Sequence, residues 1–223
     1  MTKVDLQSLP RGERKKIKTR DALLVAAQEL ILEKGVRDVT VNQITESADI
    51  GLGTFYNYFK TKDDVLDGIA ELLYDSYHAD VDRIVEGVTD PAEIVAKSAK
   101  YTINKAVDGS QWGWIMFDSG IGIRKHSITM RARGEKDMRE GAESGRFKIQ
   151  NLQLTLSMIS GGVMSVSHDI YRGFLSKDII DEALVQVLGL LGIPQEEATA
   201  IVALPLPKID PVILPISTLS ELS

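Results

Sequence analysis

Apolar residues recur at helical spacing along most of the chain, and the strict alternation that marks strands does not extend over any convincing length. The first helix is expected over about residues 12–34, with Leu23, Ala27, Leu30 and Ile31 on its buried face and Gly35 as its stop signal. Further helices are expected over about 41–48, 52–59, 61–88, 91–109, 111–119, 127–145 and 152–170, with one more after residue 176. The pattern therefore predicts an all-α fold.

Start and stop signals set the limits of the first short helices. Thr40 is an expected N-cap, and Gln43 stands at the position that completes a capping box. Asp49 follows the helix over 41–48 at a sharp turn, where aspartate tolerates a left-handed backbone. Two short helices joined by a tight turn and preceded by a longer helix describe a helix-turn-helix unit.

The second short helix is the one that would enter a DNA groove. Leu52, Phe55, Tyr56 and Phe59 lie at i, i+3, i+4 and i+7, so we expect them to form one buried stripe. The outward positions are then Gly53, Thr54, Asn57 and Tyr58. Because the sequence between positions 51 and 59 carries no charge, no acid there would repel DNA.

The later part of the chain is expected to be a larger helical domain. Thr61 caps its long first helix, and Asp90 with Pro91 marks the next helix start. The tail beyond Ala203 contains Pro205, Pro207, Pro211 and Pro215, so it is expected to run extended over the body. The predicted division is a head over residues 1–62 with a basic N-terminal arm, an effector-binding and dimerisation domain over 63–203, and a proline-rich tail over 204–223.

Composition narrows the class of protein. The 223 residues are 43% hydrophobic and 26% charged, which is typical of a globular chain. Without cysteine there is no disulfide, thiolate nucleophile or cysteine-bound metal. Neither a membrane-spanning run nor a secretory signal is evident, so a cytoplasmic location is expected.

Charge is distributed unevenly along the chain. The net charge is −6, yet residues 1–62 hold 11 basic against 8 acidic side chains. The densest basic stretch runs from Arg11 to Arg20. This asymmetry suggests an anion-binding end on an acidic body, and a solvated helix face explains the same pattern equally simply.

Residues 40–69, "TVNQITESADIGLGTFYNYFKTKDDVLDGI", resemble the tetracycline-repressor (TetR) family of transcriptional regulators. The family pattern is matched by Thr40, Ile44, Ala48, Gly53, Thr54, Tyr56, Phe59, Thr61 and Lys62. Thr45, Asp49, Gly51 and Tyr58 depart from it. The resemblance covers about 50 residues directly and implies an N-terminal helix-turn-helix DNA-binding domain followed by a ligand-binding and dimerisation domain.

The resemblance also implies the DNA contacts. Thr40, Tyr56 and Lys62 would contact phosphates, and the Tyr58 hydroxyl could do the same. Leu52, Gly53, Thr54 and Asn57 would face base edges. The basic arm with Arg11, Lys15 and Lys16 would reach phosphate or the minor groove. Core packing of Tyr56, a solvated Lys62 and a disordered arm are the alternatives.

Two apolar seams predict a dimer interface. Family members are homodimers whose last two helices form a four-helix bundle across a two-fold axis. The seam residues here are Leu156, Ile159, Val163, Val166, Ile170, Ile180, Leu184, Val187 and Leu191. Packing of both seams within one subunit is the alternative. A homodimer would recognise a palindromic operator on double-stranded DNA.

The middle of the chain is expected to hold a pocket for an unknown small-molecule effector. Candidate lining residues are Tyr77, Tyr101, Trp112, Trp114, Met116, Phe117 and Met158, all of which would serve equally as plain core. A basic cluster of Arg124, Lys125, His126, Arg131 and Arg133 could receive an anionic effector or form solvated surface. By the resemblance, the long helix over 63–88 would couple effector binding to operator affinity.

The hypothesis is a dimeric, ligand-responsive DNA-binding regulator that acts as a repressor. An alternative is a DNA-binding regulator without a small-molecule effector, controlled by a protein partner. An enzyme is the remote alternative, because the three histidines lack metal-binding spacing and His168, Asp169 and Ser167 are adjacent and not placed as a catalytic triad. We expect no catalytic residue, no metal and no cofactor.

Overall fold

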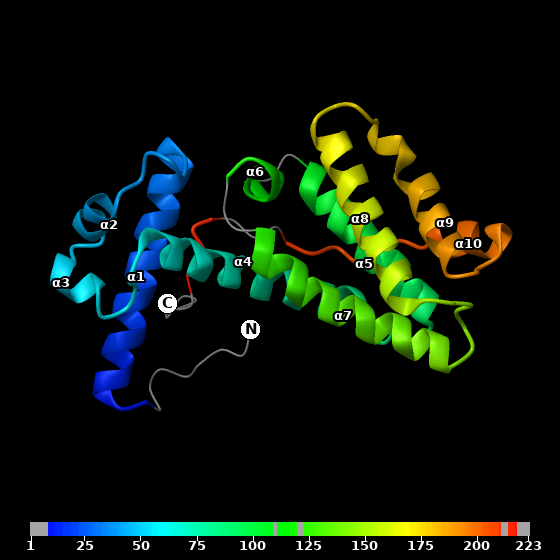
Figure 1. Ribbon diagram of the computed structural model, residues 1–223, viewed down its shortest axis with the longest axis horizontal. Helices are drawn as coiled ribbons and strands as arrows, with labels where there is room; N and C mark the ends of the chain where they lie inside the picture. The colour runs from blue at the N-terminus through cyan, green and yellow to red at the C-terminus, as the bar shows by residue number, and fades with distance from the viewer. Residues whose placement is uncertain (1–8, 109–110, 120–122, 211–213, 218–223) are drawn as a thin grey trace. The chain divides into compact units, whose positions relative to one another are not determined.

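The computed structural model describes residues 9–108, 111–119, 123–210 and 214–217, with the backbone alone at residues 111 and 123–130. All regular structure within these ranges is helical, which confirms the all-α prediction (Figure 1). The chain forms two compact units. Of the described residues, the first unit contains 9–79, 119, 123–125 and 214–217, and the second contains 80–108, 111–118 and 126–210. The division falls within the long helix α4.

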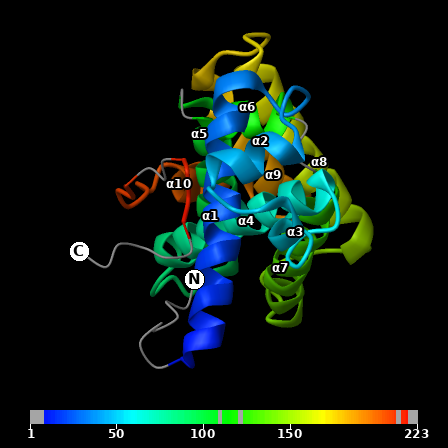
Figure 2. The same cartoon turned by 90° about the vertical axis from the view of Figure 1, so that its left-hand side faces the viewer.

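The first unit consists of α1 (Arg11–Lys34), α2 (Val41–Ser47), α3 (Leu52–Phe55) and the first part of α4 (Lys62–Ile84). The helix α2 packs on α1 (Figure 2), and α3 packs on α2. Leu23, Leu24, Ile44 and Phe55 are completely buried or nearly so and form the core of this unit. At Gly68 the backbone of α4 approaches α1 so closely that a Cβ would lie 3.0 Å from the Leu24 side chain.

Local sequence signals end and start these helices as expected. Gly35 has φ of 81° and ends α1. At the start of α2 the main-chain N–H of Gln43 donates to the Thr40 hydroxyl. In return, the main-chain N–H of Thr40 donates to the side-chain oxygen of Gln43 at 3.0 Å. Asp49 has φ of 52°. The capping box and the left-handed turn are confirmed.

The expected buried stripe on the second short helix is half wrong. Phe55 and Phe59 are buried, whereas Leu52 is 44% and Tyr56 55% exposed. The regular helix ends at Phe55, and the chain continues through i+3 hydrogen bonds from Asn57 to Thr54 and from Tyr58 to Phe55. These tighter turns change the angle between successive side chains, so the stripe drawn for a regular helix does not hold.

The second unit contains most of the remaining helices. They are α5 (Pro91–Val107), α6 (Gln111–Phe117), α7 (Ile123–Glu143), α8 (Leu152–Tyr171), α9 (Ile180–Leu190) and α10 (Gln195–Val202). The helices α5, α8 and α9 pack on one another (Figure 1). Two expected limits are corrected, because α4 ends at Ile84 and not near Val88, and α7 begins at Ile123 and not at Ser127.

Asp90 links three helices of the second unit. Its carboxylate caps α5 through the Ala92 amide at 3.0 Å and pairs with the Arg146 guanidinium at 2.8 Å. Arg146 also pairs with Glu197 of α10 at 2.7 Å. The hydrogen bonds from Arg146 hold the pKa of the Asp90 carboxyl below its usual range. A helix cap thereby becomes a tertiary link between α5, the end of α7 and α10.

Lys62 fastens the connection between α1 and α2 to the start of α4. Its ammonium donates to the main-chain carbonyl oxygen of Val36 at 3.0 Å and to that of Val39 at 2.9 Å. The Lys62 side chain is half-buried, and its ammonium satisfies two main-chain acceptors of the first unit. This lysine therefore stabilises the first unit, and its contact with phosphate stays a prediction.

Replacement of Lys62 with methionine should lower the stability of the first unit by about 1–2 kcal/mol, because it removes two hydrogen bonds and keeps the aliphatic stem. The measurement is thermal unfolding followed by circular dichroism. Lys60→Met is the control, since Lys60 is exposed, and it should change stability by less than about 0.5 kcal/mol. Equal effects of the two variants would contradict the structural role of Lys62.

Candidate DNA-binding surface and effector site

The helix α3 and its flanking turns present a small, uncharged polar surface. Gly53, Thr54 and Asn57 are exposed, and Gly51 precedes them as an exposed N-cap. Phe55 and Phe59 anchor the segment from below, with ring centroids 5.8 Å apart. The hydroxyl of Thr54 and the amide of Asn57 are thus available to hydrogen-bond with the donors and acceptors of a base pair. The methyl group of Thr54 could contact the methyl group of a thymine.

The two tyrosines of this segment differ in exposure. Tyr56 is 55% exposed although its ring packs edge-on against Phe55, with centroids 5.4 Å apart and planes at 89°. Tyr58 is half-buried. Core packing does not account for Tyr56 as a whole, and its exposure is compatible with the predicted phosphate contact.

The remaining predicted phosphate contacts lie on α1 and at the start of α2. Arg11, Lys15 and Lys16 are exposed on the first turns of α1, so they belong to a helix and not to a free arm. The Thr40 side chain is exposed, and its oxygen is within 3.3 Å of the Gln43 amide nitrogen that it caps. Their contacts with DNA stay predictions.

Both apolar seams are buried within the single chain. Every predicted interface residue on α8 and α9 is buried except Val166, which is half-buried, and Leu191 just after α9 is buried as well. The seams pack where α5, α8 and α9 meet, and their part in a dimer stays a prediction. The heptad pattern therefore marks the inner faces of these helices, and the exposed apolar residues beside it are Leu154, Met158 and Leu190.

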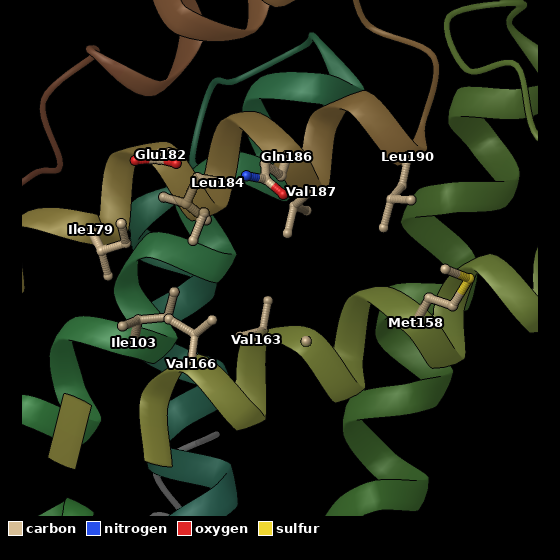
Figure 3. A pocket seen from close by; sticks show the side chains of 12 residues that line it. Ile103, Met158, Val163, Val166, Ile179, Glu182, Leu184, Gln186, Val187 and Leu190 are labelled. Atoms are coloured by element: carbon tan, nitrogen blue, oxygen red, sulfur yellow. The ribbon is translucent and has the colours of Figure 1, made fainter. Parts of the chain in front are cut away.

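A groove of about 400 Å³ runs between α8 and α9 (Figure 3). Val163, Val166, Leu184 and Val187 form its floor and point toward one another. Its rim includes Met158 at 51% and Leu190 at 43% exposure, together with Gly162, Glu182 and Gln186. A Cβ at Gly161 or Gly162 would meet nothing within 4 Å, so no described residue covers these two positions of α8.

The predicted effector residues do not form one set. Trp112 and Met116 are buried, and Tyr101, Trp114 and Phe117 are half-buried, all in the second unit. Tyr77 is buried but belongs to the first unit. Met158 is 51% exposed on the rim of the groove, so it is not plain core, and its contact with an effector stays a prediction.

A buried polar network lies at the end of α4 that belongs to the second unit. Asp80 is completely buried, and its carboxylate accepts hydrogen bonds from Arg83 at 2.8 Å, from Lys105 at 2.8 Å and from the Tyr101 hydroxyl. The Lys105 ammonium also donates to the Tyr101 oxygen at 2.7 Å and lies 5.0 Å from the Trp112 ring centroid. The network joins α4, α5 and α6.

Sequence reasoning included Tyr101 and Trp112 but missed Asp80 and Lys105. A signal existed, because Asp80 follows Tyr77 by three residues and so falls beside the apolar stripe of a helix. A charge in that position is rarely buried without a partner. The partner, however, stands on another helix at an unrelated spacing.

The predicted basic cluster is only partly described. The side chains of Arg124, Lys125 and His126 lie outside the described residues. Arg131 donates to Gln153 at 2.6 Å and Ser157 at 3.1 Å, and Arg133 pairs with Asp82 at 2.7 Å. Arg131 and Arg133 thus hold α7 to neighbouring helices.

Asp118, at the end of α6, is tied to α8. It accepts a hydrogen bond from the Tyr171 hydroxyl at 2.8 Å and pairs with Arg172 at 2.5 Å. The hydrogen bond from Tyr171 lowers the pKa of the Asp118 carboxyl. Among the described residues, no helix is long and apolar enough to cross a membrane, and no group of histidine and acidic side chains is placed to hold a metal ion.

Known proteins resemble the chain along most of its length. The family model described as "Bacterial regulatory proteins, tetR family" matches residues 23–69, and the one described as "Tetracyclin repressor-like, C-terminal domain" matches residues 90–204. The crystal structure of RolR in complex with resorcinol is 30% identical, with a TM-score of 0.71, over 90% of this chain and all of that one.

Curated relatives match over the N-terminal part. The regulator HbdR of Aromatoleum sp. is 35% identical over 74 residues, and the repressor KstR2 of Mycolicibacterium smegmatis is 30% identical over 74 residues. These matches span 33% of this chain and 32% and 36% of the two relatives, about a third of their length. The two family models together account for both units, and the chain belongs to the TetR family of bacterial regulatory proteins.

Proposed function

We propose that the protein is a homodimeric transcriptional regulator that represses from a palindromic DNA operator and is released by a small-molecule effector. The observation that carries DNA binding is the exposed, uncharged surface of α3, held on a core of Phe55 and Phe59. A regulator of this kind works where the chromosome lies, so the proposed location is the cytoplasm. The regulatory family, and not the lack of catalytic residues, argues against an enzyme.

Thr54 and Asn57 are the proposed base-reading residues. Both are exposed, and an asparagine amide can pair with the N6 and N7 atoms of adenine. Tyr56, Thr40 and the basic side chains at the start of α1 are the proposed phosphate contacts. We therefore expect the base-reading residues to determine which DNA sequence is preferred. The phosphate contacts should determine how strongly binding depends on salt.

Operator selection from random duplex DNA tests the proposal. The wild type should enrich a palindrome with half-sites about one helical turn apart or more. Asn57→Ala should relax the preference at one position of each half-site at a cost of about 1–3 kcal/mol, whereas Lys16→Ala should weaken binding to all sequences and reduce the salt dependence. An unchanged preference in Asn57→Ala would remove Asn57 from base reading, and the absence of any enriched sequence would overturn DNA regulation.

The groove between α8 and α9 is the proposed dimer interface. Its floor is apolar, its rim carries exposed Met158 and Leu190, and Gly161 and Gly162 allow a second helix to approach closely. The seam residues Val163, Val166, Leu184 and Val187 form this floor, so the proposed interface keeps part of the predicted set and adds the rim. The other five seam residues are buried within the subunit.

Met158→Asp should convert the dimer to a monomer, because it places a charge on a surface that dimerisation would desolvate. Sedimentation equilibrium measures the change, with an expected loss of at least about tenfold in dimer affinity for a penalty of 1.4 kcal/mol or more. Leu204→Asp is the matched control, since Leu204 is 39% exposed and lies outside α8 and α9. A dimer that survives Met158→Asp would place the interface elsewhere.

A phenolic compound is the proposed class of effector. RolR was crystallised with resorcinol, a dihydroxybenzene. In this chain the Tyr101 hydroxyl, itself a phenol, lies between the Asp80 carboxylate as acceptor and the Lys105 ammonium as donor, with the Trp112 ring beside them. The same donor and acceptor would satisfy the hydroxyl of a phenolic ligand, and the rings would stack on it.

Lys105→Met should raise the resorcinol concentration needed for release from the operator by about tenfold. The reason is that it removes one hydrogen bond to the ligand, which contributes about 1.4 kcal/mol. Fluorescence anisotropy measures operator affinity with and without resorcinol, which separates the effect of the lost Asp80 partner on basal affinity from the loss of response. Lys97→Met is the control on the same helix, because Lys97 pairs only with Glu93 among the described contacts, at 2.6 Å. A wild type that ignores resorcinol and other simple phenols would contradict the proposed effector class.

A further inference from the structure

The buried face of α1 contains two polar side chains among apolar ones. Asp21 is 5% and Gln28 2% exposed, and both accompany Leu24, Ala27 and Ile31 on the inner side of the helix. They are seven residues apart, which places them two turns apart on one face. A carboxylate and an amide in such surroundings need hydrogen-bond partners, because burial without them is costly.

The end of the chain supplies those partners. The Gln28 side-chain nitrogen donates to the carbonyl oxygen of Ile216 at 2.9 Å, and the Ile216 amide donates back to the Gln28 side-chain oxygen at 2.9 Å. The amide of Gln28 thus pairs with the main chain at two points, as a neighbouring strand would. The Ser217 hydroxyl then donates to the Asp21 carboxylate at 2.6 Å. These residues are 188 and 196 positions apart in the sequence.

Residues 214–217 belong to the N-terminal unit, although they come from the other end of the sequence. The family model that matches the second unit ends at residue 204, so the contacts of residues 214–217 lie beyond the matched region.

We propose that residues 214–217 form a strap that is part of the fold of the N-terminal unit and stabilises α1. The strap docks on α1 through Gln28 and Asp21. Because it gives both buried polar side chains a partner, the inner face of α1 depends on it for its hydrogen bonds.

The docked strap leaves the surface of α3 accessible. Gly53, Thr54 and Asn57 are all exposed while Ile216 and Ser217 contact α1. The strap is therefore a positioning element of the N-terminal unit and not a cover of its proposed DNA-binding surface. Its docking is independent of whether the protein binds DNA.

A disulfide tests the docking directly, because the chain contains no cysteine of its own. In the full chain, Asp21→Cys with Ser217→Cys should form an intramolecular disulfide almost completely under mild oxidation, since the two side chains touch. Glu29→Cys with Ser217→Cys is the matched control, because Glu29 is exposed on α1 beside Gln28, and it should not cross-link within the molecule. Equal cross-linking of the two pairs, or none in the first, would overturn the docked strap.

Hydrogen exchange tests whether the strap supports α1. Gln28→Ala in the full chain and removal of residues 211–223 should each speed amide exchange in residues 21–31 by at least about tenfold, while exchange in α8 stays unchanged. If the strap acts through Gln28, the two changes together should do no more than the truncation alone. Additive effects, or a truncation that leaves α1 protected, would show that residues 214–217 are no part of this fold.

Discussion

The requirement that buried polar groups find partners organises both units of this protein. Asp80, Gln28 and the carbonyl oxygens bonded by Lys62 all have hydrogen-bond partners from other parts of the chain. Each of these contacts joins elements that apolar packing alone would leave free to slide, because a hydrogen bond has a direction and an apolar contact does not. The apolar core decides that the helices associate, and the polar contacts decide in which register they do so.

The sequence predicted well the features that depend on neighbours along the chain. The capping box of Thr40 and Gln43, the left-handed Asp49 and the cap at Asp90 each involve residues within a few positions of one another. The contacts of Lys62, Lys105 and Gln28 could not be predicted in this way, since their partners lie 23 to 188 positions away. Local rules indicate where a helix begins but contain no information on which distant group will meet its side chains.

Periodicity identified the apolar faces of helices but not what covers them. The seam of α8 fits a heptad, and the structure uses it inside the subunit, against α5 and α9. The part of this surface that remains open is the groove with Met158 and Leu190 on its rim, which is the proposed interface with a second copy. A helix apolar on more than one side has more than one partner, and the spacing alone does not say which side belongs to which partner. Leu52 and Tyr56 were misplaced for another reason, because α3 ends at Phe55 and a stripe drawn over residues 52–59 assumes a longer regular helix.

The polar residues of the two units differ in a way that fits the proposed function, in which an effector binds one unit and changes the DNA affinity of the other. The surface of α3 is polar and uncharged, so duplex DNA would meet no unpaired charge there and attraction would come from the basic start of α1. The charges of the second unit include a fully buried group, Asp80, on the helix that continues into the first unit. A ligand that rearranged the partners of Asp80 would act on α4 itself, because a buried carboxylate cannot lose a partner without moving or gaining another. Such a change would need no long pathway of side chains, since the same rigid helix begins at Lys62 in the DNA-binding head.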